Sequence, residues 1–364
     1  MFTRQDLQDL VNSDTQGHPV LSLYLTTDLT QHLKEERRLA LKKLLDPLGE
    51  DAQPDVERAQ KFFDHEFDWQ AQGIALFSSA GAGFWRVIRL AVPILDFATI
   101  EPRPNVGLLA DALDEHACYV VALVDRDHAR FFAMQMGEIT EFSPELPPTP
   151  GRQKQGGPSA ARFQRHADAL ALQNLKQAAR LAHGFFNSRE CSRLLLAGTE
   201  DVLVQFRGLL TKTWQKRIVG EFAMDMHAPA NTVLAKAQEL VAHFERDQEA
   251  AQVEELTTAA RKKRATATLG LADTLNALLE GKVMTLVAAA NYSAEGYVCD
   301  NCGFLAAQKV DRCPLCGANM RAVDHMVELA IHKALRLGSR VEIVHDPAAA
   351  KLKALGAIGA MLRF

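Results

Sequence analysis

Four of the six cysteines stand in two short pairs, which is the spacing of many metal sites. Two residues separate Cys299 from Cys302, Cys313 and Cys316 repeat that spacing, and a glycine follows each pair. A Cys-x-x-Cys turn directs two thiolates at one ion, and two such turns complete a tetrahedral sulfur site, which favours Zn²⁺. Because four protein ligands leave no position for water, we expect a structural zinc ion within residues 297–320. A redox pair or an iron–sulfur cluster is the alternative.

A glycine loop before a helix-like run is the second segment whose residues could bind a ligand. The loop consists of Gly156, Gly157, Pro158 and Ser159, and proline is favourable at a first helical position. The four cations near it are Arg152, Lys154, Arg162 and Arg165. A helix N-terminus carries unpaired N–H groups and a partial positive charge, so the segment predicts a site for RNA phosphates. Taken alone, the same residues also suit an ordinary turn.

The overall composition indicates a globular protein with several cores. A chain of 364 residues exceeds a usual domain of about 100–200 residues, and we expect three domains. The net charge of −4 argues against a uniformly basic nucleic-acid binder, so any RNA contact must come from local patches. Cys118 and Cys191 lie beside strand-like segments and are expected to be core residues rather than nucleophiles.

Neither the N-terminal residues nor the hydropathy along the chain suggests export or membrane insertion. The first residues lead into a charged amphipathic helix and lack the basic and apolar regions of a signal peptide. The sequence also lacks an apolar run of about 18 residues. We therefore expect a cytoplasmic protein with no membrane partner.

The hydrophobic pattern predicts an α/β protein. A strand at 20–25 and a hairpin over 73–88 are expected in the first part, with helices between them. Three strands over 117–142 form a meander, and strands then alternate with helices to the end of the chain. The later elements are helices ending near 184 and covering 230–264, 270–281 and 324–337, and strands at 193–197, 218–224, 283–287 and 340–344.

Taken together in this order, these segments resemble the archaeal and eukaryotic class-1 release factors and their relative Pelota, in a divergent bacterial branch. Residues 156–163 match the family's GGQSAARF loop at seven of eight positions. The run Val120 to Phe132 is similar to the start of the family's middle domain. Residues 270–275 and 356–364 resemble the opening helix and the glycine-rich terminal strand of its last domain. Archaeal members carry a four-cysteine mini-domain where this ribbon sits.

The resemblance implies three domains. They are an α+β N-terminal domain at 1–110, an RNase H-like middle domain with the loop at 111–264, and a ribosomal-protein-like, Pelota-type C-terminal α/β domain at 265–364 with an inserted zinc ribbon. It also implies action in the ribosomal A site beside the peptidyl-transferase centre. The implied partners are ribosomal RNA, tRNA and a translational GTPase, for which elongation factor Tu is the bacterial candidate.

Two departures from the family pattern limit the expected activity. The first domain lacks a TASNIKS-like element, so stop-codon reading is not expected. Pro158 stands where the family has its catalytic glutamine, and proline has no N–H to donate to a developing oxyanion. Since losing one such donor costs on the order of 10²–10³ in rate, we expect no ester hydrolysis and name no catalytic residue.

Three functions fit this sequence. The leading hypothesis is a ribosome-associated factor that occupies the A site in ribosome hibernation or stalled-ribosome recognition, similar to a hibernation factor of the same branch. The second is a rescue peptidyl-tRNA hydrolase or nuclease that uses Arg162, Arg165 or His166. The third is an RNA-binding protein that works away from the ribosome.

Overall fold

The chain folds into two compact units. The computed structural model describes residues 2–49, 52–147, 160–189, 191–262 and 264–363. Residues 116–245 form one unit, here called the middle unit, and residues 1–115 together with 246–364 form the other, the composite unit. Domain boundaries at 110 and 264 stay predictions. Every helix in the described part of the chain is too short or too polar to cross a lipid bilayer.

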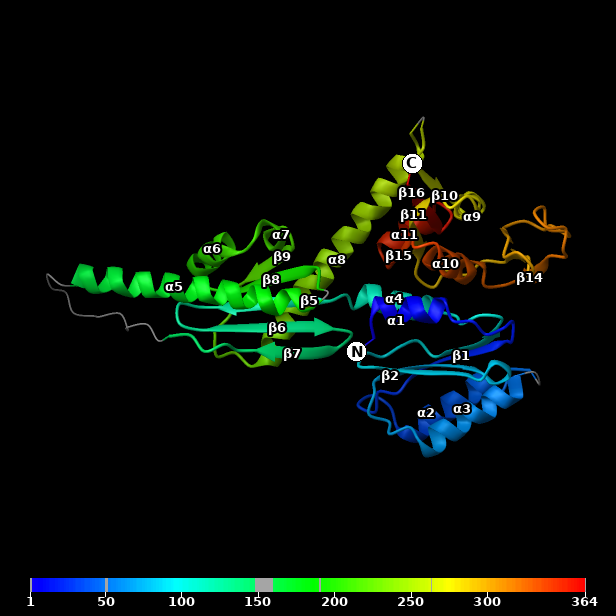
Figure 1. Cartoon of the computed structure of the whole chain (residues 1–364), viewed down its shortest axis with the longest axis horizontal. Coiled ribbons are helices and arrows are strands. Elements are labelled where there is room, and N and C mark those ends of the chain that lie inside the picture. The colour runs from blue at the N-terminus through cyan, green and yellow to red at the C-terminus, as the bar shows by residue number, and fades with distance from the viewer. Residues whose placement is uncertain (1, 50–51, 148–159, 190, 263, 364) are drawn as a thin grey trace. The chain divides into compact units, whose positions relative to one another are not determined.

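A five-stranded mixed sheet lies at the centre of the middle unit (Figure 1). Its order is β7-β6-β5-β8-β9. The first three strands in the chain form an antiparallel meander, and the last two join it in parallel, which confirms the predicted mixed α/β sheet. The strands are β5 (Tyr119–Val124), β6 (Ala129–Gln135), β7 (Glu138–Phe142), β8 (Arg193–Gly198) and β9 (Ile218–Phe222).

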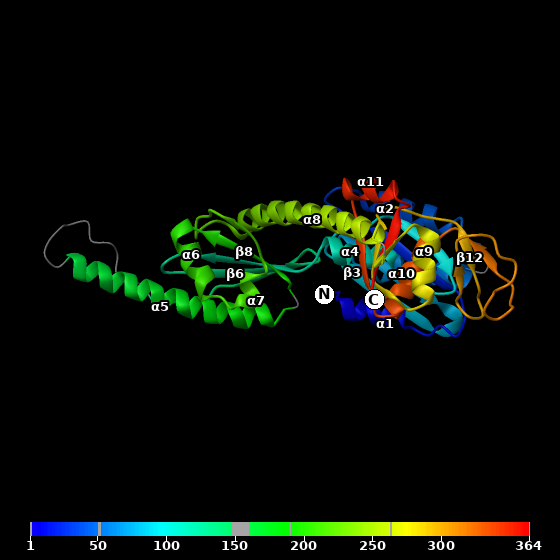
Figure 2. The same cartoon turned by 90° about the horizontal axis from the view of Figure 1, so that it is seen from above.

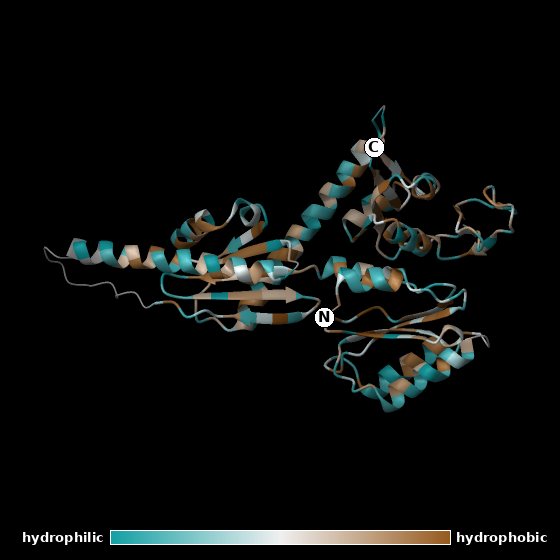
Figure 3. Cartoon of the chain, viewed as in Figure 1, coloured by the Kyte–Doolittle hydropathy of each residue, from teal (hydrophilic) through white to brown (hydrophobic). Residues whose placement is uncertain are grey.

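Helices cover both faces of this sheet. The helices α5 (Ala160–Asn187) and α6 (Glu200–Leu209) pack on one face, and the first half of α8 (Ala230–Ala260) packs on the other (Figure 2). Alternate residues of β5 point to the two cores, so the whole strand is apolar, as Figure 3 shows for the central strands. A continuous apolar run is typical of a strand buried on both faces. A short helix, α7 (Lys212–Gln215), precedes β9.

Cys118 and Cys191 lie in the core of the middle unit, as the sequence predicts. Their exposed fractions are 7% and 2%, and both belong to the apolar cluster beneath α5. They precede the parallel neighbours β5 and β8, and their sulfur atoms are joined in a disulfide with the Cα atoms 4.5 Å apart. The sequence pattern did not predict this pairing, because the two residues are 73 positions apart.

The first sheet of the composite unit is antiparallel throughout, in the order β3-β2-β1-β4. The predicted hairpin is confirmed, with the 3-10 turn η2 (Ala80–Ala82) between its strands. The helices α2 (Lys34–Leu45) and α3 (Gln53–His65) share an apolar core with β1 and β2. The strands are β1 (Val20–Thr26), β2 (Gly73–Ser79), β3 (Phe84–Leu90) and β4 (Phe97–Glu101).

The second sheet of the composite unit is mixed, in the order β10-β16-β11-β15. The helices α9 (Leu271–Leu279) and α10 (Met326–Arg336) cover one face. The other face packs against α11 (Ala348–Lys353) and the second half of α8. The strands are β10 (Ala267–Leu269), β11 (Val283–Ala289), β15 (Arg340–Val344) and β16 (Ile358–Leu362).

Two helices from the first part of the chain pack against the second sheet and its covering helix. The N-terminal helix α1 (Arg4–Val11) and helix α4 (Gly107–Glu115) contact α10, and α4 also contacts β15. The sequence analysis did not predict α4. A small three-stranded ribbon lies between β11 and α10 in the chain, where the cysteine pairs predict it. Its strands, in the order β13-β12-β14, are β12 (Gly296–Val298), β13 (Leu305–Ala306) and β14 (Arg321–Val323).

Candidate functional site

The two cysteine pairs form two turns of the same design. In the first, the Cys299 N–H donates to the Phe304 carbonyl at 2.9 Å, and the Gly303 N–H donates to the Cys299 carbonyl at 2.8 Å. Cys313 and Gly317 repeat both bonds in the second turn. Gly303 and Gly317 have φ angles of 71° and 75°, a backbone conformation that favours glycine. This requirement explains the glycine that follows each pair.

The four cysteine sulfurs converge on a single point. All four Sγ atoms lie within 4.8 Å of one another. The Cys299–Cys316 and Cys302–Cys313 sulfur pairs are each 3.4 Å apart. A tetrahedral site with Zn–S bonds of about 2.3 Å has sulfur–sulfur edges of about 3.8 Å, so the four thiols fit one metal ion. The geometry therefore brings together all four predicted ligands.

A lysine ties this ribbon to the rest of the composite unit. The Lys333 ammonium on α10 donates to the Gly303 carbonyl at 3.0 Å. Burial lowers the pKa of Lys333 from its ordinary value, with the positive charges of Arg103 and Arg336 acting in the same direction. The contact fixes the first cysteine turn against α10.

The described part of helix α5 begins at Ala160, and Pro158, the predicted first helical residue, lies outside the described residues. Its first described arginines, Arg162 and Arg165, are exposed, as is His166. The earliest buried residue of α5 is Ala167 within the described part, and Figure 1 shows the N-terminal end of α5 extending beyond the sheet of its own unit. The start of α5 is therefore accessible to a ligand.

Six of the predicted RNA-binding residues lie outside the described residues. They are Arg152, Lys154, Gly156, Gly157, Pro158 and Ser159. Their assignment stays a prediction, as does the role of Arg162 and Arg165.

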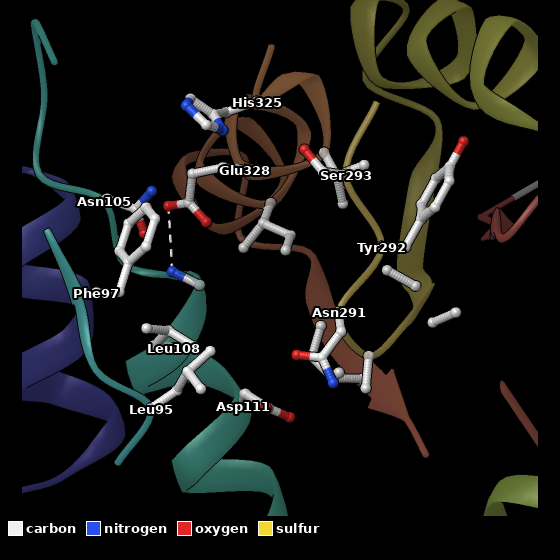
Figure 4. Close-up of a pocket in the computed structure, with 17 residues that line it drawn as sticks. Leu95, Phe97, Asn105, Leu108, Asp111, Asn291, Tyr292, Ser293, His325 and Glu328 are labelled. Atoms are coloured by element: carbon white, nitrogen blue, oxygen red, sulfur yellow. Dashed lines mark hydrogen bonds between the residues drawn. The ribbon is translucent and has the colours of Figure 1, made fainter. Parts of the chain in front are cut away.

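A pocket of about 200 Å³ lies in the composite unit between α4, α10 and the segment after β11 (Figure 4). Its labelled polar residues are Asn105, Asp111, Asn291, Tyr292, Ser293, His325 and Glu328. Leu95, Phe97 and Leu108 supply apolar walls. The pocket thus combines a few polar groups with an apolar lining, which is typical of a small-molecule site.

Glu328 joins α10 to the start of α4. Its Oε1 atom accepts the N–H groups of Val106 and Gly107 at 2.6 and 3.1 Å. These N–H groups have no partner within their own helix, so a carboxylate is favourable there. Burial nevertheless raises the pKa of Glu328 to about 8, and the negative charge of Glu101 acts in the same direction. The two hydrogen bonds oppose this shift but do not cancel it.

The side chain of His345, just after β15, contacts both α4 and α8. His345 Nε2 lies 3.3 Å from Asp111 Oδ1 on α4, and His345 Nδ1 lies 3.4 Å from Glu249 Oε1 on α8. The hydrogen bond with Asp111 is the largest cause that raises the pKa of His345, to about 9. The imidazole is therefore positively charged at neutral pH. Sequence reasoning missed this group and Glu328 because their partners are about a hundred or more positions away.

Comparison with known proteins finds one family model that matches part of the chain and two relatives that align along nearly all of it. Residues 104–242 match the model of bacterial archaeo-eukaryotic release factor family 10. The chain is 23% identical to peptide chain release factor subunit 1 of Pyrococcus abyssi, over 99% of this chain and 97% of that protein. It is also 23% identical to the protein of the same name from Methanocaldococcus jannaschii, over 98% of this chain and 96% of that protein.

Among solved structures, the chain is similar to a model of ribosome-bound archaeal Pelota and ABCE1, with 14% identity and a TM-score of 0.45 over 100% of this chain and 94% of that one. The structure of Archaeoglobus fulgidus Pelota is 13% identical to this chain, with a TM-score of 0.35, and the match covers 100% of this chain and 92% of that one. The family-model match to residues 104–242 and the similarity to the two relatives along nearly the whole chain support a bacterial branch of the archaeo-eukaryotic release factor and Pelota family.

Proposed function

We propose that this protein is a ribosome-associated factor that occupies the A site without hydrolysing the peptidyl-tRNA ester. It acts in ribosome hibernation or in the recognition of stalled ribosomes. The observation that carries the proposal is the loop at residues 156–163, which keeps the release-factor sequence except for Pro158. Its relatives of similar length are release factors by name, which supports a role in translation.

The start of α5 supports contact with RNA. Arg162 and Arg165 are exposed on its first turns, and Arg152 and Lys154 precede them in the sequence. Arginine and lysine side chains and helix N-termini are common ligands of phosphate oxygens, which position a protein on RNA without reading its sequence. We infer that this end of α5 contacts ribosomal RNA or tRNA near the peptidyl-transferase centre.

Pro158 supports binding without hydrolysis. A glutamine at this position would offer both a side-chain amide and a backbone N–H to the attacking water or the developing oxyanion. Proline offers neither, and its φ angle is fixed near −65°. Because a missing oxyanion donor alone costs on the order of 10²–10³ in rate, the protein should hold the site and leave the ester intact.

Co-sedimentation with purified bacterial ribosomes tests the binding. We expect the full chain to pellet with ribosomes, and the double variant Arg162→Ala/Arg165→Ala to pellet much less. Arg180→Ala is the matched control, because Arg180 is exposed on the same helix but farther along it. A chain found only in the free fraction, with ribosomes from growing or stationary cells alike, would contradict the proposal.

An enzyme is the second candidate, and one observation favours it. Arg162 and His166 are both exposed and lie one helical turn apart on α5, so they can face one substrate. Peptidyl-tRNA on stalled ribosomes distinguishes the two functions. Peptide release or tRNA cleavage that disappears in His166→Ala, with ribosome binding retained, would establish a rescue hydrolase or nuclease instead.

We propose that the four-cysteine site holds a structural Zn²⁺ ion. An all-sulfur tetrahedral set with no open position suits zinc, and the ribbon has little apolar core of its own. Elemental analysis of protein purified without added metal should give zinc at one ion per chain. Iron with a visible charge-transfer band would point to an iron–sulfur cluster.

The remaining partners follow from the family. We propose tRNA and a translational GTPase, with elongation factor Tu the bacterial candidate, and pull-down from ribosome fractions tests both. Binding to free RNA away from the ribosome is the third function. Filter binding over a series of salt concentrations measures the affinity for free RNA. Tight binding in the absence of ribosomes would support this third function.

A further inference from the structure

Two carboxyl groups and one imidazole, that of His325, line the pocket beside Glu328. Of the described residues that line it, Glu328 and Asp111 are carboxylic acids, and none is lysine or arginine. Its walls of Leu95, Phe97 and Leu108 are apolar. A volume of about 200 Å³ suits a small molecule. The lining therefore favours a ligand with one positive group and a short apolar body.

One oxygen of Glu328 remains available to a ligand. Within the described residues its hydrogen bonds to Val106 and Gly107 both use Oε1. A Cβ atom built on Gly107 would lie 2.2 Å from Oε2, so this oxygen occupies the space that the glycine leaves open. In Figure 4 the second oxygen of Glu328 points toward the interior of the pocket. No described residue therefore donates a hydrogen bond to this oxygen.

Among the residues that the structure describes, Glu328 forms no ion pair. The negative charge of Glu101 raises the pKa of Glu328 further. The charged imidazole of His345 already contacts two other carboxylates, those of Asp111 and Glu249. His325 lines the same pocket and acts electrostatically on Glu101. A cation placed at Oε2 would favour the ionised carboxylate, so ligand binding and loss of the Glu328 proton are linked.

We propose that this pocket binds a small organic cation, whose ammonium or guanidinium group contacts Glu328 Oε2 while its apolar body packs against Phe97 and Leu108. The site lies in the composite unit and is independent of ribosome binding by α5. The sequence shows no ligand-binding motif in the residues that line this pocket.

Calorimetric titration of the full, metal-containing chain with 3-methylbutylamine at pH 7 tests the proposal. We expect saturable binding at one site. The alcohol 3-methylbutan-1-ol has the same shape without the charge, and it should bind at least about tenfold more weakly, because a charge-assisted hydrogen bond is lost. Absence of saturable amine binding, or equal affinities for amine and alcohol, would overturn the proposal.

Glu328→Gln separates the charge from the structural contact. Its amide oxygen can still accept the Val106 and Gly107 N–H groups, while the negative charge is gone. Amine affinity should fall at least about tenfold, with the alcohol unaffected. Glu255→Gln, at an exposed position of α8 outside the pocket, should bind the amine as the wild type does. Undiminished amine binding by Glu328→Gln would contradict the assignment.

Proton release on amine binding can be measured with the unmodified chain. It tests whether the amine contacts Glu328 even if the Glu328→Gln variant does not fold. Because the pKa of Glu328 is raised to about 8, amine binding at pH 7 should release a proton to the buffer. The apparent binding enthalpy should therefore differ between two buffers with different ionisation enthalpies. An enthalpy that is the same in both buffers would show that the ammonium group does not contact this carboxyl.

Discussion

The middle unit and the composite unit are held together in different ways. The middle unit is built on one sheet whose two faces are buried under helices by apolar side chains. The composite unit contains two sheets, polar contacts between remote segments, with Glu328 and His345 as examples, and a ribbon that contains the four clustered cysteines. Apolar burial and the cysteine cluster follow local patterns in the sequence, whereas the contacts of Glu328 and His345 depend on residues brought together by the fold.

Metal removal should have the largest effect and should separate the two units most clearly. A structural zinc site contributes a binding free energy of about 10–16 kcal/mol to the fold that surrounds it. With a strong chelator, amide hydrogen exchange should lose its protection at β12 to β14, while β5 in the middle unit stays protected. Exchange that accelerates equally in both places would contradict this difference.

Cys316→Ala gives the same test by mutation, and Leu315→Ala is its control. Leu315 is 63% exposed and lies next to the ligand in sequence. The cysteine variant should lose its metal and the protection of the ribbon, whereas the leucine variant should keep both. The comparison separates ligand loss from a change of the neighbouring surface.

A core substitution should damage the middle unit by a smaller amount. Phe131 is fully buried and contacts the rings of Phe142, Phe185 and Phe186. Phe131→Ala should lower the free energy of unfolding of this unit by about 3–5 kcal/mol, measured by chemical denaturation. Val204→Ala, at a position that is 59% exposed, should change it by about 0.5 kcal/mol or less.

The composite unit should become less stable as pH rises through the titration of Glu328. Folding raises the pKa of this group from 4.5 to about 8, so its stabilising contribution is complete below about 4.5 and is lost as pH rises through about 8. Glu328→Gln should remove this part of the pH dependence. Thermal unfolding from pH 4 to 9 measures it, and parallel curves for the variant and the wild type would show that Glu328 does not titrate as expected.

His345 should give the smallest effect, in a later pH window. Its pKa is raised from 6.5 to about 9, so the stability from its two carboxylate contacts is complete below about 6.5 and is lost as pH rises through about 9. His345→Gln should flatten the curve only in that window, because the side chain is 36% exposed and its ion pairs are partly screened. A change confined to lower pH would contradict this assignment.

Much of the middle unit could be predicted because its pattern is local. Strand β5 is apolar throughout and β8 is apolar after Arg193, and such runs indicate strands buried on both faces. The cysteine site could also be predicted, since all four ligands lie within 18 consecutive residues at 299–316. In both cases a short stretch of sequence contains the whole physical reason for the structure.

The contacts that join the composite unit could not be predicted in this way. Glu328 and Gly107 are 221 positions apart, and each is an ordinary residue in its own helix. The α4 helix itself was missed, because part of its stabilisation comes from a carboxylate on α10 rather than from a capping residue beside it. The Cys118–Cys191 disulfide likewise depends on two strands becoming parallel neighbours.

The central claim is that the chain binds the ribosome but does not cleave the ester. The most direct measurement follows both properties in one sample, with peptidyl-tRNA in the P site of purified ribosomes and the full chain added in excess. We expect the chain to sediment with these ribosomes while the peptidyl-tRNA remains intact. Peptide release at a rate comparable to that of a release factor, or a chain that stays in the supernatant, would contradict the account.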